Sequence, residues 1–427
     1  MKIMADSIND TIKKQVLELG RNARRASREL MGWNAEQKNR ALESMAEALE
    51  RNTASIQETN AMDVKEAREN GLSDAMVDRL VLNEDRMAAM TRGLRDIALL
   101  PDPAGRILKS WKKDNGLLLK KVAVPIGVIG MIYESRPNVT ADAAALCLKA
   151  SNAIILRGGS EALRSNQAIA DALQKGGRAA GLPDHAIQLV PVRDRAAVRA
   201  LITMDKYVDV IIPRGGEGLI RAVAENATVP VLKHYEGICH VYVDAAADQA
   251  KAWSIVENAK CQRPGVCNAA ETLLVDAALD PQWLAKMADV LEARGVELRG
   301  DERARKIVPA MKEAVEKDWR TEYLDLILSV RVVDGIEQAV EHINTYGSGH
   351  SDAIVSEDAK KQDYFGRMVD SAAVYINAST RFTDGAEFGM GAEIGISTDR
   401  LHARGPVALE ELTTYKYVVT GTGQIRQ

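Results

Sequence analysis

The spacing of apolar positions changes along the chain, and these changes predict its organisation. Residues 5–100 show apolar side chains three and four positions apart, which predicts helices at Ala35–Arg51, Ala61–Asn70 and Glu84–Leu99. From 122 to 236, and again from 239 to 376, short apolar runs alternate with helical patterns. Such alternation indicates parallel sheets with helices on both faces, which bind ligands at the carboxyl ends of their strands. The pattern therefore predicts an α/β fold with two parallel-sheet domains.

The two alternating regions predict individual elements. In the first, strands are expected at Val122–Ile132, Ala153–Arg157, Ile187–Val190, Tyr207–Ile212 and Val229–Leu232. Its helices are expected at Thr140–Ala150, Ser160–Lys175 with Ser160 as N-cap, Ala196–Met204, and from Gly215 to Glu225. In the second region, strands are expected at Cys239–Val243, Thr272–Val275, Leu326–Val333, Asp352–Val355 and Ala373–Ile376. Pro281 is expected at the first position of a helix behind Asp280 as cap.

A lysine-rich hairpin is predicted between the N-terminal helices and the first sheet. Asp114-Asn115-Gly116 separates two strand-like runs, and Asn-Gly is a strong hairpin signal because both turn positions favour positive φ. The hairpin carries Trp111, and an isolated two-stranded hairpin is marginal in water. We expect it to project and pair with another subunit. The strand-like run Thr414–Thr420 is expected to pair with it.

Cys267 is the first candidate for chemistry. A helical pattern over Gln249–Lys260 precedes it, and Pro264-Gly265 breaks the backbone just before it, which places the cysteine on a turn at the edge of a packed core. Arg263 nearby would favour the reactive thiolate. A buried, unreactive cysteine is the alternative, because a free cysteine is usually a small core residue. The local sequence leaves both interpretations open.

Composition narrows the function classes. A chain of 427 residues suggests two or three domains, and a net charge of -4 makes nucleic acid an unfavoured partner. Four cysteines make no disulfide framework, and neither their spacing nor that of His342 and His350 indicates a metal site. The longest apolar run, Val122–Tyr133, is shorter than the roughly 20 residues that span a bilayer. Residues 1–30 lack the apolar core of a signal peptide, so we expect a soluble cytoplasmic protein without a membrane partner.

Five stretches carry distinctive residue combinations in a fixed order. They are Gly127–Thr140 (GVIGMIYESRPNVT), Glu236–Asp244 (EGICHVYVD), Asn258–Asn268 (NAKCQRPGVCN), Val333–Ile354 with AVEHINTYGSGHSDAI inside it, and Phe388–Pro406 (FGMGAEIGISTDRLHARGP). Together they resemble the γ-glutamyl phosphate reductase family, a branch of the aldehyde dehydrogenase superfamily. The resemblance runs from about residue 120 to 420, and the fourth stretch is its most specific part. It implies an aldehyde dehydrogenase-like fold with two Rossmann-like domains and a small β oligomerisation element.

The resemblance implies a reaction and its catalytic groups. The reaction is the reduction of L-glutamyl 5-phosphate by NADPH to L-glutamate 5-semialdehyde and phosphate, the second step of proline biosynthesis from glutamate. Cys267 would attack the acyl phosphate and hydride would reach the resulting thioester. Asn138 and the backbone N–H of Cys267 resemble the oxyanion donors, each worth roughly 3 kcal/mol in well-studied hydrolases. A helix cap is the other interpretation of Asn138.

The cofactor residues are also implied by resemblance, since neither GxGxxG nor GxxxxGK[ST] occurs in the chain. The superfamily's ribose-binding turn corresponds to Arg157-Gly158-Gly159-Ser160, where a hydroxyl and an arginine would accept a 2′-phosphate that a glutamate would repel. This favours NADP over NAD, although Glu161 follows one residue later. Gly215 and Gly216 resemble the pyrophosphate contact at a helix start. Glu322 resembles the glutamate that holds the nicotinamide ribose.

The remaining expectations concern substrate, partners and domains. Arg136, Arg263, Arg381 and Arg404 are candidates for binding the substrate carboxylate and phosphate, with surface salt bridges as the alternative. Glu236 aligns with the water-activating glutamate of hydrolytic relatives, and its role stays open, as do those of His342 and His350. We expect a homo-oligomer, with glutamate 5-kinase as a further partner for which the sequence gives no sign. The expected domains are a cofactor domain (1–105, 126–237 and 377–405), a catalytic domain (238–376) and an oligomerisation element (106–125 and 406–427).

Two other functions remain open. A coenzyme A-acylating aldehyde dehydrogenase would use the same thioester chemistry without phosphate. A non-catalytic binding or scaffolding protein could retain the fold, since fold alone does not define function. An intact Cys267 together with Asn138 argues against the second.

Overall fold

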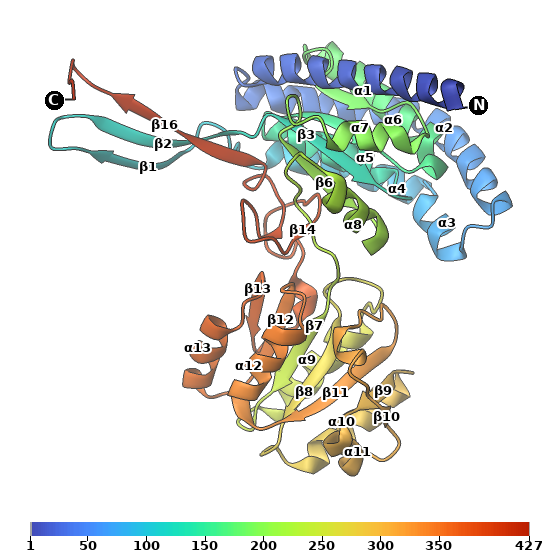
Figure 1. Ribbon diagram of the computed structural model, residues 1–427, viewed down its shortest axis with the longest axis vertical. Coiled ribbons are helices and arrows are strands. Elements are labelled where there is room, and N and C mark those ends of the chain that lie inside the picture. Colours follow the sequence, from blue (N-terminus) through green and yellow to red (C-terminus); the bar gives the residue numbers. More distant parts are fainter. Residues whose placement is uncertain (1, 427) are drawn as a thin grey trace. The chain divides into compact units, whose positions relative to one another are not determined.

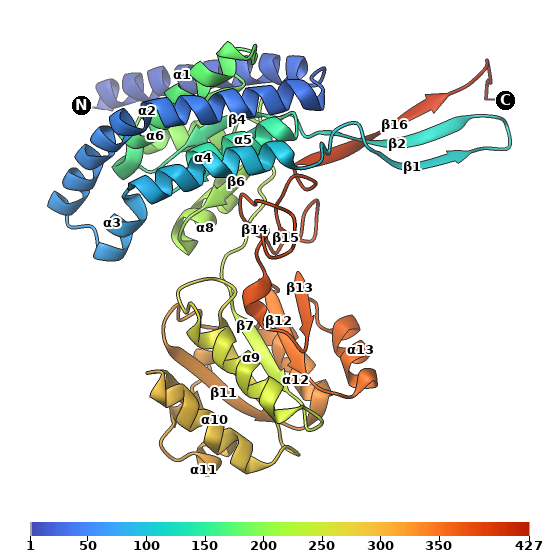
Figure 2. The same cartoon turned by 180° about the vertical axis from the view of Figure 1, so that it is seen from behind.

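The structure, a computed structural model, describes residues 2–426, with side chains described from Asp10 onward. It divides into two compact units. Unit 1 holds the described residues up to Lys233, together with Gly389–Gly395 and the residues from Val407 onward. Unit 2 holds His234–Phe388 and Ile396–Pro406. Figures 1 and 2 show both units from opposite sides.

The units differ from the predicted domains mainly near the C-terminus. Residues 377–405 were expected in the cofactor domain, but 377–388 and 396–406 belong to unit 2. The physical reason is local bonding: the Thr380 hydroxyl donates to the Asn268 carbonyl at 2.7 Å, and Ile396 pairs with Pro406 inside the same unit. The boundary predicted after 237 lies at 233/234.

Unit 1 is built on a four-stranded parallel sheet. Its strand order is β5–β4–β3–β6, with bounds β3 Val128–Tyr133, β4 Ala153–Arg157, β5 Ile187–Leu189 and β6 Val210–Arg214. All six residues of β3 are buried, as expected for a central strand flanked on both sides. The carboxyl end of β3 therefore opens onto the middle of the sheet edge, where parallel sheets bind ligands.

Helices surround this sheet. Their bounds are α1 Lys2–Leu30, α2 Ala35–Glu69, α3 Asp74–Leu80, α4 Glu84–Leu99, α5 Asn138–Lys149, the 3₁₀ turn η1 Ser160–Ala162, α6 Leu163–Ala179, α7 Arg195–Ile202 and α8 Glu217–Asn226. The long α2 packs against both α6 and α4, α4 packs on α5, and α1 packs on α7 (Figures 1 and 2). Asn34 caps α2 with a reciprocal capping box to Gln37.

Unit 2 contains a seven-stranded parallel sheet. Its order is β10–β9–β11–β8–β7–β12–β13, with bounds β7 Cys239–Val243, β8 Ala270–Asp276, β9 Glu297–Gly300, β10 Lys312–Glu313, β11 Ile327–Val333, β12 Ser351–Val355 and β13 Ala373–Ile376. Its helices are α9 Gln249–Cys261, α10 Pro281–Ala293, α11 Glu302–Ile307, η2 Asp318–Arg320, α12 Gly335–Tyr346, α13 Ala359–Met368 and η3 Thr380–Phe382. Asp280 caps α10 ahead of Pro281, as predicted. A short antiparallel pair, β14 Ile396–Ser397 with β15 Gly405–Pro406, completes the unit.

The predicted hairpin forms an arm of unit 1. Strand β1, Ile107–Lys112, pairs antiparallel with β2, Leu118–Pro125, and β16, Thr413–Thr420, adds to the other edge of β2 as expected. The turn differs from the prediction, because only Gly116 has positive φ (+87°). The Gly116 N–H donates to Lys113 O and the Lys113 N–H to Leu117 O, which is the three-residue loop with a glycine bulge.

Four other expectations were wrong in detail. The two helices predicted over 35–70 are one continuous helix, α2, because the polar stretch between them is also helical. The strand predicted at Val122–Ile132 breaks before Gly127, whose φ is +131°. The run Val229–Leu232 contributes only one isolated bridge, between Val231 and Ile211. Ser160 makes no capping hydrogen bond and begins η1 instead. Among the described residues, no helix is long and apolar enough to cross a membrane.

Candidate active site

Cys267 lies on the turn between α9 and β8, as the breakers at 264 and 265 predict. Its side chain is half-buried. Two contacts fix the backbone around Cys267. In the first, the buried Cys239 thiol donates to the Cys267 carbonyl at 3.2 Å. Gly237 lies directly against this carbonyl, because a Cβ added at 237 would lie 1.9 Å from the Cys267 oxygen. The position of the nucleophile therefore depends on a glycine at 237.

Asn268 ties the same turn to η3. Its side-chain amide donates to the Thr383 carbonyl at 2.9 Å and its own carbonyl accepts from the Thr380 hydroxyl at 2.7 Å. Arg381 lies in the segment between Thr380 and Thr383, and its Nε donates to Gln262 Oε1 at 2.9 Å. These bonds join the two ends of the turn to the segment that carries Arg381.

The other three cysteines of the chain are held as thiols. Burial raises the pKa of Cys147 and of Cys239, and burial together with the nearby Glu257 raises the pKa of Cys261. All four cysteines are free. Since the thiolate is the reactive form, these environments disfavour the other three as nucleophiles.

Two of the four candidate arginines lie near the thiol. Burial lowers the pKa of Arg381, the positive Arg263 lowers it further, and Cys267 acts in the opposite direction. Arg263 is exposed and Arg381 is half-buried, and Arg381 interacts electrostatically with both Arg263 and Cys267. Arg404 is instead engaged by Asp370, whose carboxylate and carbonyl accept from it at 2.8 and 2.7 Å. Arg136 lies in unit 1, on the loop between β3 and α5.

Glu322 supports the nucleophile turn indirectly. Its Oε1 accepts from the Gly237 N–H at 2.9 Å, and the Ser348 hydroxyl accepts from the next N–H, that of Ile238. The pKa of the neighbouring Glu271 is raised to about 7 by burial, although its Oε2 accepts from Lys260 at 2.7 Å. A contact of Glu322 with a nicotinamide ribose stays a prediction.

The two histidines of the most specific motif are buried in unit 2. His342 is buried between the rings of His240, Trp319 and Tyr346, and Arg331 donates to its Nδ1 at 2.7 Å. Burial lowers its pKa to about 2, with the nearby cations contributing. The His342 ring therefore stays neutral. His350 is also buried, beside Ser351.

Asn138 is the first residue of α5, and it does not act as a cap. Its exposed side chain donates to Asp142 Oδ2 at 2.9 Å, one turn further along the helix. An amide nitrogen carries two hydrogens, so one donor remains for a ligand. Burial raises the pKa of Asp142 to about 6, and the Asn138 bond opposes that rise. Asp142 thus orients the predicted oxyanion donor.

The turn after β4 brings Arg157 close to Arg195 and to the carboxylates of Glu161 and Asp194. Arg157 donates to the Gly158 carbonyl at 2.9 Å and to the Arg193 carbonyl at 3.1 Å. Burial lowers the pKa of Arg157, Glu161 opposes this shift, and the nearby Arg195 adds to it. Among the described residues, Arg195 has no ion-pair partner. Ser160 is exposed at the same turn.

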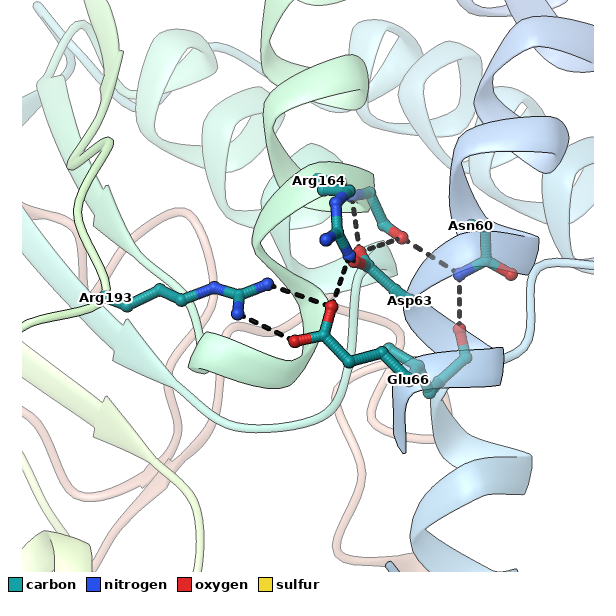
Figure 3. Close-up of polar contacts among 7 residues, drawn as sticks. Asn60, Asp63, Glu66, Arg164 and Arg193 are labelled. Atoms are coloured by element: carbon teal, nitrogen blue, oxygen red, sulfur yellow. Dashed lines mark hydrogen bonds and ion pairs between the residues drawn. The ribbon is translucent and has the colours of Figure 1, made fainter. Parts of the chain in front are cut away.

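Arg193, by contrast, is neutralised. Figure 3 shows Glu66 of α2 accepting from both Arg193 and Arg164, while Arg164 also reaches Asp63. Hydrogen bonds from Arg193, then Arg164, lower the pKa of Glu66 to about 2. This network anchors Arg193, whose backbone carbonyl accepts from Arg157. Arg195 takes no part in the network.

The helix start at Gly215 and Gly216 is occupied by a side chain. The Gly216 N–H donates to Glu134 Oε2 at 3.0 Å, and a Cβ at Gly215 would lie 2.5 Å from that oxygen. Anions favour helix N-termini, so the carboxylate takes the place predicted for a pyrophosphate. A phosphate that binds there must displace Glu134.

Sequence reasoning missed Glu134, Asp142 and Gly237. Asp142 had a readable signal, since i and i+4 residues share a helix face. Glu134 and Gly237 act on partners distant along the chain, at Gly216 and Cys267, and no local pattern indicates them.

The chain matches the aldehyde dehydrogenase family over residues 4–318. Among curated relatives, the γ-glutamyl phosphate reductase of Moorella thermoacetica is 56% identical over 413 residues, covering 97% of this chain and 99% of the relative. That of Halothermothrix orenii is 52% identical over 416 residues, covering 97% and 100%. The chain therefore belongs to the aldehyde dehydrogenase family and, within it, to the γ-glutamyl phosphate reductases. Membership implies an oxidoreductase with a nicotinamide cofactor.

Solved structures agree with this placement. The crystal structure of γ-glutamyl phosphate reductase from Thermotoga maritima is 47% identical, has a TM-score of 0.95, and covers 96% of this chain and 100% of that one. An acetylating aldehyde dehydrogenase from Geobacillus thermoglucosidasius has a TM-score of 0.67 at 19% identity, covering 98% and 99%, and shows a shared fold. The predicted aldehyde dehydrogenase-like fold is confirmed.

Asp142 gives a pH-dependent prediction. Its pKa is about 6 when folded, against an ordinary value of 3.8, so ionisation opposes folding. Asp142→Asn should therefore stabilise unit 1 above pH 6, by on the order of 1–2 kcal/mol, and the gain should vanish below about pH 4. Denaturant unfolding at pH 4 and pH 7.5 checks this. An equal effect at both pH values would contradict the assignment.

Proposed function

We propose that the chain reduces L-glutamyl 5-phosphate to L-glutamate 5-semialdehyde and phosphate with NADPH, through a thioester on Cys267. Curated relatives that are 52–56% identical over nearly the whole chain carry the name of this activity. The single observation that carries the proposal is the half-buried Cys267, held on a braced turn beside Arg263 and Arg381.

In the proposed mechanism, the Cys267 thiolate attacks the acyl carbon and phosphate leaves. Bound NADPH supplies the hydride that reduces the thioester. The backbone N–H of Cys267 and the free amide hydrogen of Asn138 stabilise the oxyanion, with Asp142 holding the Asn138 side chain in place. Collapse of the thiohemiacetal then returns Cys267 and releases the aldehyde.

Arginines fit the two anionic groups of this substrate. Arg263 and Arg381 lie beside Cys267, where the phosphate would depart, and a guanidinium binds phosphate through two parallel hydrogen bonds. Arg136 and Arg404 remain further candidates for the α-carboxylate. Arg404 is the weaker one, because Asp370 already accepts from it twice.

The residues after β4 fit NADP. Arg157 carries a buried Nε without a hydrogen-bond partner among the described residues, and Arg195 supplies a second, unpaired charge close to it. The carboxylate of this turn, Glu161, accepts from Ser135 through Oε1 and also acts electrostatically on Arg157. A 2′-phosphate beside Ser160 would meet a hydroxyl and two cations, with Glu161 held by the loop before α5. Gly158 would line the rest of the dinucleotide, Gly215 and Gly216 would do so once Glu134 is displaced, and Glu322 would hold the nicotinamide ribose.

The arm supports an oligomeric protein. Its three strands expose apolar and aromatic side chains at Ile107, Leu108, Tyr415, Tyr417 and Val419, each at least 43% accessible. Exposed apolar patches of this kind mark interfaces, so we propose that a second copy of the chain covers the arm. Free cysteines fit a reducing compartment such as the cytoplasm.

The decisive assay is oxidation of L-glutamate 5-semialdehyde with NADP in the presence and absence of inorganic phosphate. NADPH should form only when phosphate is present, because phosphate must release the acyl group from Cys267. Coenzyme A should not replace it. Turnover with coenzyme A alone would identify the acylating alternative, and no turnover with either would favour a binding protein.

Cys267→Ala tests the nucleophile. It should lower kcat by more than about 10⁴-fold, because the covalent route is lost, while NADPH binding measured by fluorescence stays within about threefold. Cys261→Ala is the matched control, at the end of the preceding helix α9, and its kcat should change by less than about threefold. If Cys261→Ala were inactive and Cys267→Ala active, the nucleophile would be misassigned.

Ser160→Glu and Arg195→Gln test cofactor choice. Each should shift the ratio of kcat/KM with NADPH to that with NADH toward NADH by about tenfold or more, since charge-assisted hydrogen bonds are worth about 1.5–3 kcal/mol. Arg193→Gln is the control, because Glu66 already neutralises that side chain. An unchanged ratio in both test variants would remove this turn from the 2′-phosphate site.

A further inference from the structure

Ser135 is a strained residue just ahead of the predicted oxyanion donor. It lies between β3 and α5 with φ of +38°, in the left-handed region that residues with a side chain rarely adopt. Its side chain is buried. A conformation of this kind persists only where its surroundings hold it, and it gathers at functional sites.

The group that holds Ser135 is the carboxylate of Glu161. A single oxygen, Oε1, accepts from the Ser135 N–H and from its hydroxyl, both at 2.7 Å. The carboxylate reaches this position by lying across its own chain at Gly159, where a Cβ would be 2.0 Å from Oε1. The Oε1 atom of Glu161 is thus engaged by the loop between β3 and α5.

The backbone conformation at Ser135 sets the position of Asn138, because only Arg136 and Pro137 lie between the two residues. Pro137 has a fixed φ of -58°, and Asn138 follows it as the first residue of α5. On the other side of Ser135, Glu134 binds the Gly216 N–H. The loop is therefore held at two consecutive residues, and the Glu161 contact is the one that fixes the strained backbone.

We propose that Glu161 is a positioning residue for catalysis: it locks Ser135 in the strained conformation that aims Asn138. This rests on the proposed function, in which Asn138 donates to the oxyanion. It gives Glu161 a role in the chemical step and none in cofactor choice.

The experiment compares Glu161→Ala, Glu161→Gln and the double variant Glu161→Ala with Ser135→Gly. Glu161→Ala should lower kcat roughly 100-fold, since small misplacements of catalytic groups cost that much, with KM for NADPH and substrate within about threefold. Glu161→Gln keeps an acceptor oxygen and should retain kcat within about tenfold of the parent. Ser135→Gly in the Glu161→Ala background should recover about tenfold, because glycine adopts positive φ without strain. Asp171→Ala, an exposed carboxylate on α6, is the control that should match the parent.

A second readout is independent of turnover. Hydrogen exchange of the peptide around Ser135 should be slow in the parent and in Glu161→Gln and fast in Glu161→Ala. Should Glu161→Ala fail to fold, Ser135→Ala, which loses one of the two bonds, should show a smaller kcat loss and intermediate exchange. An unchanged kcat, an altered NADPH to NADH ratio, or unchanged exchange overturns the proposal. A parent without phosphate-dependent activity would overturn the proposed function, while the exchange data would still test the lock.

Discussion

The contact of Gly237 with the backbone of Cys267 is the constraint on which unit 2 depends. A Cβ at 237 would lie 1.9 Å from the Cys267 carbonyl oxygen and 2.5 Å from the Cys267 Cα. The two backbone segments therefore touch, with no space for a side chain at 237. Glu322 fixes the Gly237 N–H and Cys239 donates to the same carbonyl. The nucleophile is therefore supported by backbone contacts, together with the buried Asn268 side chain of its own turn. Such fixed geometry is what a transition state requires of its donors.

In unit 1, side-chain carboxylates hold the loops around the predicted site. Glu66 neutralises Arg193 and Arg164, Glu134 occupies the N-terminus of α8, and Glu161 holds Ser135. Each of these carboxylates accepts hydrogen bonds from the chain itself. Glu161 and Asp194 are also close enough to Arg157 to raise its pKa against the effect of burial.

The sequence predicted most elements of the sheets and the location of the nucleophile, for identifiable reasons. Strands β4, β7 and β13 are found at the predicted bounds, because each is an apolar run ended by strong turn or helix signals. The turn at Cys267 was readable because Pro264-Gly265 must break the helix. Errors arose where tertiary context decides: Val229–Leu232 is apolar, yet only one of its residues bridges to β6. The Asn115-Gly116 turn was located correctly, but its type was not, since a third loop residue changes the geometry.

The site itself was predictable only in part, because its supporting contacts are long-range. Cys267 and Asn138 could be found from motifs, whereas Glu161 and Ser135 are 26 positions apart and meet only when β3 and β4 lie side by side. The same parallel register, with Ile132 opposite Arg157, brings the loop after β3 next to the turn after β4. The predicted oxyanion donor and the predicted ribose turn are thus neighbours by sheet topology. The Oε1 atom of Glu161 holds the loop, and the same carboxylate acts electrostatically on Arg157 of the ribose turn. One side chain therefore connects the strained Ser135 with the turn that is predicted to hold the ribose.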